Sequence, residues 1–315
     1  MLHLRSPDQM VERPSRISLR GWKSIVIRAV FAMGVRNLSV AAAGVAFYGF
    51  LSIFPALGLL SGVLGLFLDP GDLRNTLWSL RDTLPSATHA ALEEHIRRLL
   101  AAPKEVAGAA LIFGMVMGLW STNAAMRAVM MALNIAYRED ERRSFLRFHL
   151  TALAMTAASV LFVLGVFGVL AILPIVFESM WIADWVERVF GYLRWPVLAV
   201  LSGLVLAVLY SYGPSRREAK WRWVTWGAVV ATAVWLAAAA LFSIYVAHFA
   251  DMEGAFGSLG AVVGLMLWFY VSAYCTLFGA VLNAETELQT ARDTTIGPPR
   301  PMGKRGAYVA DHVVD

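Results

Sequence analysis

The residues of this sequence that could do chemistry are polar side chains inside apolar stretches. The segment WSTNAAMRAVMMALN, residues 120–134, ends an apolar block and carries Asn123, Arg127 and Asn134. An ionisable group in a membrane segment is a candidate functional residue, because hydrocarbon does not solvate its charge. Basic and hydrogen-bonding side chains in such a place can hold an anionic head group, which is the chemistry of recognition and transport.

Hydrolytic chemistry has much less support. The six histidines are scattered, HExxH does not occur, and no Asp/Glu cluster is placed for two-metal cleavage of a phosphodiester. His248, Asp251 and Glu253 are close in sequence, but they favour a polar external turn over a metal site. The single cysteine, Cys275, is typical of a small packing residue. We therefore predict a protein that is not an enzyme, with no metal, no cofactor and no nucleic-acid partner.

The elements that must position the polar residues are long apolar blocks. Hydrophobic residues make up 58% of the 315 residues and charged residues only 16%, against about 45–50% and about 25% in soluble domains. A membrane-spanning helix needs about 20 mainly apolar residues. We predict an all-α polytopic membrane protein with six transmembrane helices, over residues 41–68, 107–133, 149–176, 196–213, 223–247 and 258–283.

The distribution of Lys and Arg predicts the orientation of these helices. The N-terminal tail, the second loop, the fourth loop and the C-terminal tail together hold 19 of the 27 basic residues. Loops rich in Lys and Arg stay on the cytoplasmic side, so both termini are expected to be cytoplasmic. The net charge of +5 is thus explained by membrane topology and does not require a nucleic-acid partner.

Three further segments complete the predicted organisation. Residues 1–40 are a basic cytoplasmic tail whose apolar and basic end is expected to lie on the inner leaflet, although a role in orientation alone would explain it equally. Residues 69–103 carry leucines at helical spacing and predict two amphipathic helices in the first external loop, either a packed hairpin or a gating lid. Residues 286–315, after the six-helix domain of residues 41–285, are rich in Pro and Gly and predict a disordered cytoplasmic tail.

Polar residues of four predicted helices fall in the cytoplasmic half of the membrane. We predict that they line a polar recess that opens to the cytoplasm and is closed outside by apolar packing. Pro55, within the first span, is expected to kink it beside this recess, because a proline frees a backbone carbonyl. The candidate recess residues are Tyr48, Ser52, Asn123, Arg127, Asn134, Tyr210, Asn283 and Glu285.

Other roles remain open for these residues. Arg127 is near enough to the inner boundary to reach the head groups with its side chain. Tyr210 and Tyr212 could belong to an interfacial aromatic belt, and Asn123 and Asn134 could form hydrogen bonds between helices. Glu285 could be a solvated residue just beyond the last span.

Glycine spacing predicts close packing between the helices. Small residues four apart let two backbones approach in lipid, where polar groups and packing replace the hydrophobic effect. The pairs with this spacing are Gly58 and Gly62, Gly114 and Gly118, and Gly260 and Gly264, and Gly257 precedes the last pair.

Four segments of the sequence resemble the YihY/BrkB family of bacterial inner-membrane proteins, once labelled ribonuclease BN. The segments are AAAGVAFYGFLSIFP, GLWSTNAAMRAVMMALNIAY, LYSYGPSRREAKWRWVTWGAVVA and FGSLGAVVGLMLWFYVSAYCTLFGAVLNAE, and by their order and spacing the resemblance extends over roughly residues 20–290. Two positions depart from the family pattern, because Trp226 replaces a common proline and Val281 replaces a common acid. The positions that follow the pattern are Tyr48, Ser52, Pro55, Asn134, Tyr210, Pro214, Gly227, Gly257, Asn283 and Glu285.

This resemblance implies a six-helix fold, a location in the bacterial inner membrane and a role related to transport. We therefore expect a transporter or translocator of a lipid or another amphiphilic or anionic solute, with membrane lipids and their anionic head groups as partners. The alternative is a non-catalytic scaffold or partner-binding protein of envelope maintenance. A homo-oligomer is compatible with either function.

Overall fold

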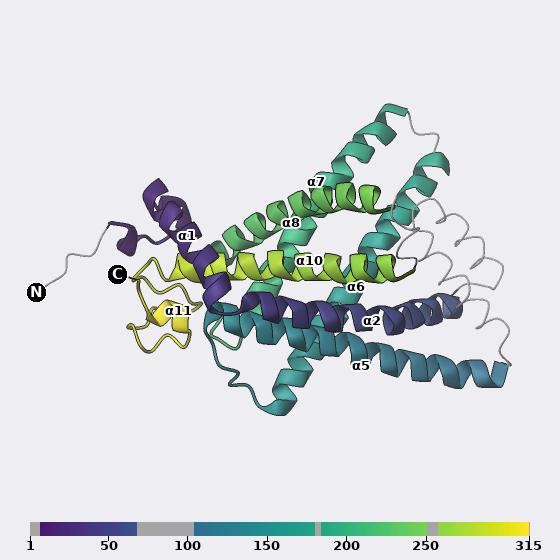
Figure 1. Cartoon of the computed structure of the whole chain (residues 1–315), viewed down its shortest axis with the longest axis horizontal. Helices are drawn as coiled ribbons and strands as arrows, with labels where there is room; N and C mark the ends of the chain where they lie inside the picture. The colour runs from purple at the N-terminus through teal and green to yellow at the C-terminus, as the bar shows by residue number, and fades with distance from the viewer. Residues whose placement is uncertain (1–6, 68–103, 180–183, 251–257, 315) are drawn as a thin grey trace, which may run out of the picture. The chain divides into compact units, whose positions relative to one another are not determined.

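The computed structural model describes residues 7–67, 104–179, 184–250 and 258–314. Within these residues the chain is helical, and its only β pairing is an isolated bridge between Ala219 and Thr295 (Figure 1). Two short 3-10 turns, Pro7–Met10 and Pro14–Arg16, precede the first α-helix. The α-helices are α1 (Leu19–Val35), α2 (Leu38–Phe67), α5 (Lys104–Tyr137), α6 (Phe145–Ser179), α7 (Asp184–Tyr212), α8 (Trp221–Ala250), α10 (Ser258–Glu287) and α11 (Tyr308–Asp311).

Six long helices cover the six predicted apolar segments, but most of them extend beyond the predicted ends. The largest difference is in α7, which begins at Asp184 and contains Pro196 in its interior. The prediction that this helix begins at Pro196 is therefore wrong. A proline removes only one backbone hydrogen bond, and in an apolar environment the rest of the backbone has no better partner than its own helix.

Several described helices have the length and composition of membrane spans. The stretches Phe145–Phe162, Trp221–Tyr245 and Val262–Glu287 are long and apolar enough to cross a membrane. The pair Leu19–Val35 and Leu38–Ile53, bent by 68°, can be counted as a fourth, whereas Pro196–Tyr212 is a shorter apolar helix. Most of the Trp221–Tyr245 stretch is exposed, and a large exposed apolar surface suits hydrocarbon rather than water.

The chain forms two compact units. Residues 1–46 and 127–315 form the first, and residues 47–126 form the second. Tyr48, Ser52, Pro55 and Asn123 belong to the second unit, whereas the other predicted recess residues belong to the first. The amphipathic helices predicted within residues 69–103, and also Gly257, lie outside the described residues.

The core of the first unit is built around α10, which packs against α1, α8 and α11. The closest approach is between α8 and α10, where a Cβ atom added to Gly279 would lie 2.6 Å from the carbonyl oxygen of Gly227 and 2.5 Å from Ala231 Cβ. Gly264 was predicted to pack closely, but an added Cβ there would meet no described atom within 4 Å.

The bend in the N-terminal region lies between α1 and α2. One face of α1, with Ile25 and Ala29, is buried, while Ile27 and Phe31 on the other face are exposed. The chain turns at Asn37, which has a φ of 51° in the left-handed region that asparagine tolerates. Helix α2 then continues through Pro55, and the predicted kink at this proline remains a prediction.

The C-terminal segment, residues 288–314, is folded, so the prediction of a disordered tail is wrong. The buried Arg305 donates hydrogen bonds to the backbone carbonyls of Ala291 and Ala310, which organises this segment although its only helix is the short α11. Asp311 accepts hydrogen bonds from the backbone N–H groups of Gly303 and Arg305. Because glycine allows the turns in between, the Pro/Gly content encodes a compact loop here rather than disorder.

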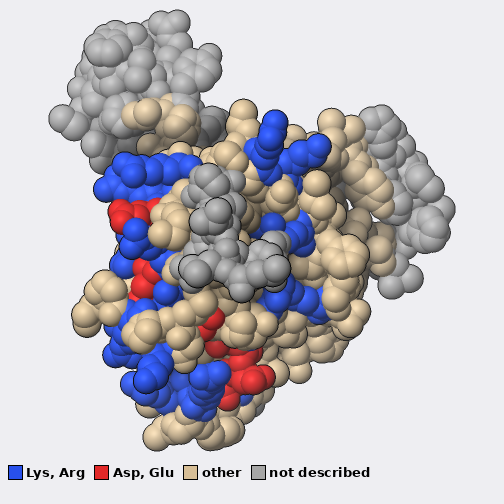
Figure 2. Space-filling view, turned by 90° about the vertical axis from the view of Figure 1, so that its left-hand side faces the viewer, with Lys and Arg blue, Asp and Glu red and all other residues tan. Residues whose placement is uncertain are grey.

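The folded tail joins the other basic segments at one end of the first unit. Tyr308 N–H donates to Glu139 in the loop between α5 and α6, and Arg217 N–H in the loop between α7 and α8 donates to Gly306. At the N-terminus, Ala291 N–H donates to the carbonyl of Gln9, and the Gln9 side chain donates to the carbonyl of Val314. Figure 2 looks onto this end and shows its many Lys and Arg residues.

Candidate functional site

Two of the predicted recess residues fasten helices of the first unit to each other. Tyr210, fully buried on α7, donates a hydrogen bond of 2.7 Å to the carbonyl of Thr276 on α10. Asn283, fully buried on α10, accepts from Gly227 N–H at 2.7 Å and donates to the carbonyl of Val224 at 2.9 Å, both on α8. Each side chain has a partner on a neighbouring helix, and the interfacial-belt alternative does not describe Tyr210.

Glu285 lies at the centre of a buried ionic cluster with only 1% of its side chain exposed. Its Oε1 pairs with Arg36 and, at 3.2 Å, with Arg138, while its Oε2 pairs with Arg28 at 3.2 Å. The three arginines come from α1, from the turn after α1 and from the residue after α5, whereas Glu285 is on α10. The alternative of a solvated Glu285 is therefore wrong, because burial and three cations hold the carboxylate in place.

Arg127 is placed beside a histidine of the next helix. Its Nη1 lies 2.7 Å from Nε2 of His149 on α6, and His149 Nδ1 lies 2.9 Å from the carbonyl oxygen of Phe145. This contact joins α5 and α6 near the start of the latter. Whether Arg127 also faces a recess remains a prediction.

The predicted residues of the second unit are described by themselves. Tyr48 is exposed, and Ser52 donates a hydrogen bond of 2.7 Å to the carbonyl of Gly49 within its own helix. Asn123 is buried. The packing glycines Gly58, Gly62, Gly114 and Gly118 lie in α2 and α5, at positions where only the helical backbone is described. The shared recess with the residues of the first unit remains a prediction.

The site that the structure does form is a groove of about 660 Å³ at the basic end of the first unit. We call it the basic groove. Its walls are the start of α6 with the preceding loop, and the end of α7 with the following loop, and one residue of the C-terminal segment closes it. The lining residues are Arg142, Arg143, Ser144, Arg147, Thr151, Ser211, Tyr212, Pro214, Ser215, Arg216, Glu218 and Gly306.

Asn134, a predicted recess residue, shapes the wall of this groove. Its side chain accepts a hydrogen bond of 2.7 Å from Ser215 N–H and donates one of 2.9 Å to Glu141. Glu141 in turn forms two contacts of 2.8 Å with the Arg143 guanidinium, which also donates to the carbonyl of Gly213. These bonds join α5 to the two loops of the groove, so the partners of Asn134 are loop residues and not residues of another helix.

The electrostatics of the wall favour an ionised Glu141. Partial burial by itself would raise the pKa of this carboxyl group, but hydrogen bonds from Arg143 and Asn134 outweigh that effect and lower the pKa to about 2. Glu141 is therefore charged over the whole physiological range. It holds Arg143 in a fixed orientation along the groove.

Arg216 forms the floor of the groove. Only 1% of its side chain is exposed, and its Nη2 donates a 2.8 Å hydrogen bond to Glu287 on α10. The guanidinium carbon lies 4.7 Å from the ring centroid of Tyr137, a cation–π contact. Within the described part of the chain, its Nε and Nη1 have no hydrogen-bond partner.

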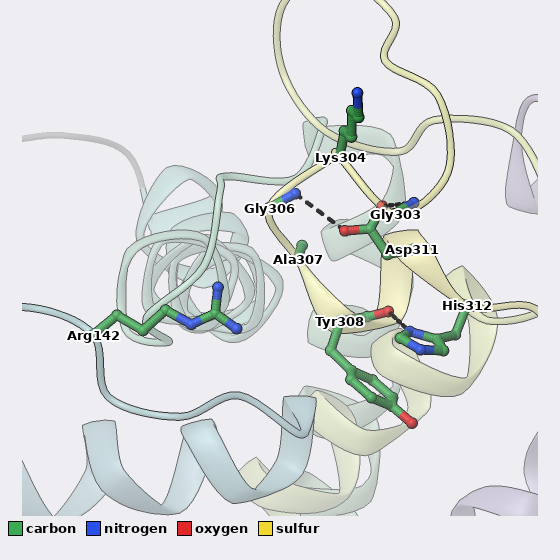
Figure 3. A pocket seen from close by; sticks show the side chains of 8 residues that line it. All are labelled: Arg142, Gly303, Lys304, Gly306, Ala307, Tyr308, Asp311 and His312. Atoms are coloured by element: carbon green, nitrogen blue, oxygen red, sulfur yellow. Dashed lines mark hydrogen bonds between the residues drawn. The ribbon is translucent and has the colours of Figure 1, made fainter.

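A smaller hollow of about 340 Å³ adjoins the basic groove and shares Arg142 and Gly306 with it. Figure 3 shows the Arg142 side chain reaching from its loop towards the C-terminal segment, where Asp311 accepts from Gly306 N–H. His312 Nδ1 lies 2.8 Å from the carbonyl oxygen of Tyr308, and the two rings stack. The C-terminal segment thus completes the outer rim of both hollows.

Exposed apolar side chains lead from the basic groove along both of its helices. On α7, Leu204, Val208 and Tyr212 are exposed at helical spacing, so they form one stripe that ends at the groove. On α6, Leu146 and Leu150 are exposed beside the groove residue Arg147. A charged site next to an apolar stripe can hold both parts of an amphiphile.

The predictions made from the sequence emphasised residues other than those that line the groove. Arg143, Arg147 and Arg216 counted there only as topological charges, because a basic loop is typical of any cytoplasmic segment. One sequence signal could have found them. The fourth loop, with SYGPSRRE at residues 211–218, and the second loop, with RSF at residues 143–145, both combine arginines with hydroxyl residues. Among the described residues, no three His, Cys, Asp or Glu side chains are grouped so that they could hold a metal ion.

The apolar helices and their charged end define a helical membrane protein, and comparison with known proteins identifies its family. The family model for the virulence factor BrkB matches residues 30–302, so the chain belongs to this family. Confirmation of the family agrees with the resemblance read from the four sequence segments. No solved structure matches the chain.

Two relatives illustrate the range of names in the family. YfkH of Bacillus subtilis, whose name describes it as ribonuclease-like, is 30% identical over 250 residues, which are 77% of this chain and 87% of YfkH. A UPF0761 membrane protein of Idiomarina loihiensis is 28% identical over 163 residues, which are 51% of this chain and 56% of that protein. Only the second name describes a membrane protein, and the words ribonuclease-like are said of YfkH alone.

Proposed function

We propose that this protein translocates a lipid or another anionic amphiphile, which enters from the cytoplasmic side through the basic groove. The observation that carries the proposal is the junction of four groove arginines with the exposed apolar stripe of Leu204, Val208 and Tyr212. The arginines offer charge to a head group, and the stripe offers an apolar surface to an acyl chain. Free inorganic ions would need no such stripe.

The proposed topology has six spans with both termini in the cytoplasm of a bacterium and the helices in its inner membrane. Two observations support it. The four segments that hold most of the Lys and Arg residues contact one another at one end of the first unit, as cytoplasmic segments must. The six long helices also coincide with the six apolar blocks of the sequence.

A translocation assay tests the proposal. The purified protein is reconstituted into vesicles with a fluorescent phospholipid, and the fraction of probe that dithionite can bleach is followed over time. Wild-type protein should expose inner-leaflet probe faster than empty vesicles do. If its rate equals that of empty vesicles for anionic and for zwitterionic probes, the proposed function is wrong.

A matched pair of variants locates the activity. Arg147→Ala removes an exposed cation from the groove, and Arg222→Ala removes an exposed cation at the same basic end that does not line it. We expect the first variant to slow translocation and the second to leave the rate unchanged. Equal effects of both variants would show that general surface charge, not the groove, attracts the lipid.

A further inference from the structure

The floor of the basic groove contains an arginine whose hydrogen-bonding capacity is only partly used. A guanidinium has five N–H donors. For Arg216, the described residues supply one acceptor, Glu287, and the face of one ring, Tyr137. Nε and Nη1 are both buried without a described partner. Because an unsatisfied buried charged donor is costly, a ligand that accepts from this edge would be favoured.

The other donors of the groove come from the wall that does not contain Arg216, at the start of α6. Arg142 and Arg147 lie on the loop before α6 and on its first turn, and Ser144 immediately precedes the helix. The first N–H groups of a helix have no partner within it and carry the positive end of the helix dipole. Donors that converge from several directions match a tetrahedral anion, whereas a planar carboxylate needs only one fork.

The charge of the groove limits the charge of the ligand. Four arginines line it, Arg142, Arg143, Arg147 and Arg216, and only one acid, Glu218. Two more carboxylates pair directly with these arginines, since Glu141 holds Arg143 and Glu287 holds Arg216. The lining residues alone carry an excess of three positive charges, with Glu139, Glu141 and Glu287 as counter-charges to Arg142, Arg143 and Arg216, so the groove surface attracts an anion such as a phosphoryl group.

We propose that the basic groove is a phosphoryl-binding site in which Arg216 binds the phosphoryl oxygens from the floor and Arg142 and Arg147 bind them from the rim. This inference rests on the proposed function, because it names the head-group chemistry of the translocated amphiphile. The groove volume of about 660 Å³ falls in the usual range of about 300–1,000 Å³ for small-molecule sites, which leaves room for more than the phosphoryl group alone. The apolar stripe on α7 lies at the exit of that space.

Binding to the full-length protein in detergent tests the inference independently of transport. Isothermal titration compares inorganic phosphate, dihexanoyl phosphatidic acid and decanoate, which has an acyl chain and a carboxylate but no phosphoryl group. We expect phosphatidic acid to bind at least tenfold more tightly than decanoate, and rising salt to weaken it. Tighter binding of phosphatidic acid than of phosphate identifies a lipid head group as the source, and equal binding identifies a free phosphoryl compound. Equal binding of decanoate and phosphatidic acid, or no binding of either phosphoryl probe, overturns the proposal.

Variants separate the floor from the rim. Arg216→Lys keeps the charge but loses the planar fork, so binding of phosphatidic acid should weaken about tenfold or more. If this variant does not elute as a monodisperse peak in size-exclusion chromatography, the exposed rim variants Arg142→Ala and Arg147→Ala test the proposal instead. Each should weaken binding of phosphatidic acid about two- to fivefold. Arg222→Ala is the control and should bind as the wild type does, and unchanged binding in both rim variants would contradict the proposal. Binding without translocation would refute the transport function alone, and translocation without binding would refute the phosphoryl site alone.

Discussion

Glu285 offers the sharpest test of what holds the basic end together. We expect Glu285→Gln to destabilise the protein strongly, because it removes the only carboxylate that pairs with Arg28, Arg36 and Arg138 among the described residues. The amide keeps the shape of the side chain but provides one acceptor oxygen and no charge. The three arginines are then left with no counter-charge at close range.

The magnitude follows from how exposed each arginine is. The Arg36 side chain is 11% exposed, so its pair with Glu285 is a buried one, and breaking a buried pair costs about 3–5 kcal/mol. The Arg28 and Arg138 side chains are 27% and 39% exposed, and solvent limits pairs of that kind to about 0.2–1 kcal/mol each. We therefore expect a total of about 3–7 kcal/mol, with Arg36 as the largest contributor.

Thermal unfolding in detergent, followed by tryptophan fluorescence, measures this loss. At about 2–4 °C per kcal/mol for a chain of this size range, the apparent Tm should fall by about 6–28 °C. Glu12→Gln, the same substitution at an exposed carboxylate, should leave Tm unchanged. A fall below 2 °C for Glu285→Gln would refute the reasoning, since it would mean that the arginines find solvent at no cost.

Three further predictions concern the other contacts of the first unit. Gly279→Ala should lower Tm, because the new methyl group would lie 2.6 Å from the Tyr210 hydroxyl and overpacking costs about 1–3 kcal/mol, whereas Gly264→Ala, in open space, should not. Arg305→Ala should let thermolysin cleave residues 288–314 rapidly while the helices stay intact, and Arg300→Ala, whose exposed side chain has no such role, should cleave as slowly as the wild type. Glu141→Gln should lower Tm at pH 7, because a lowered pKa stabilises the fold only while the carboxylate is ionised. The difference in Tm from the wild type should shrink as the pH falls from the ordinary glutamate pKa of about 4.3 towards about 2. A difference that stays constant with pH would contradict this prediction.

The sequence was sufficient for the helices and insufficient for the groove, and the physical reason is the range of the interactions. An apolar block of about 20 residues is enough to predict a membrane helix. The sequence therefore predicted α7, although not its start at Asp184. The pairs Glu285–Arg36 and Arg216–Glu287 join residues that are 249 and 71 positions apart. No local pattern distinguishes such an arginine from one that serves topology alone.

The C-terminal segment was predicted to be disordered and is folded, for a related reason. Its prolines and glycines suggested disorder, because composition does not reveal one buried side chain that binds several carbonyls. Arg305 does so for Ala291 and Ala310. These two bonds join parts of the segment that are 5 and 14 positions from Arg305, and composition alone does not reveal them.

The hydrogen bond from the Gln9 side chain to the carbonyl of Val314 has a consequence for biosynthesis. These residues are 305 positions apart, so the ribosome makes the first partner roughly 15–60 s before the second at about 5–20 residues per second. During that interval the N-terminal segment must remain outside its native place while the helices enter the membrane one after another. The native basic end can therefore form only on a finished chain, and a protein shortened at its C-terminus would leave its N-terminal segment without this contact and more open to proteolysis.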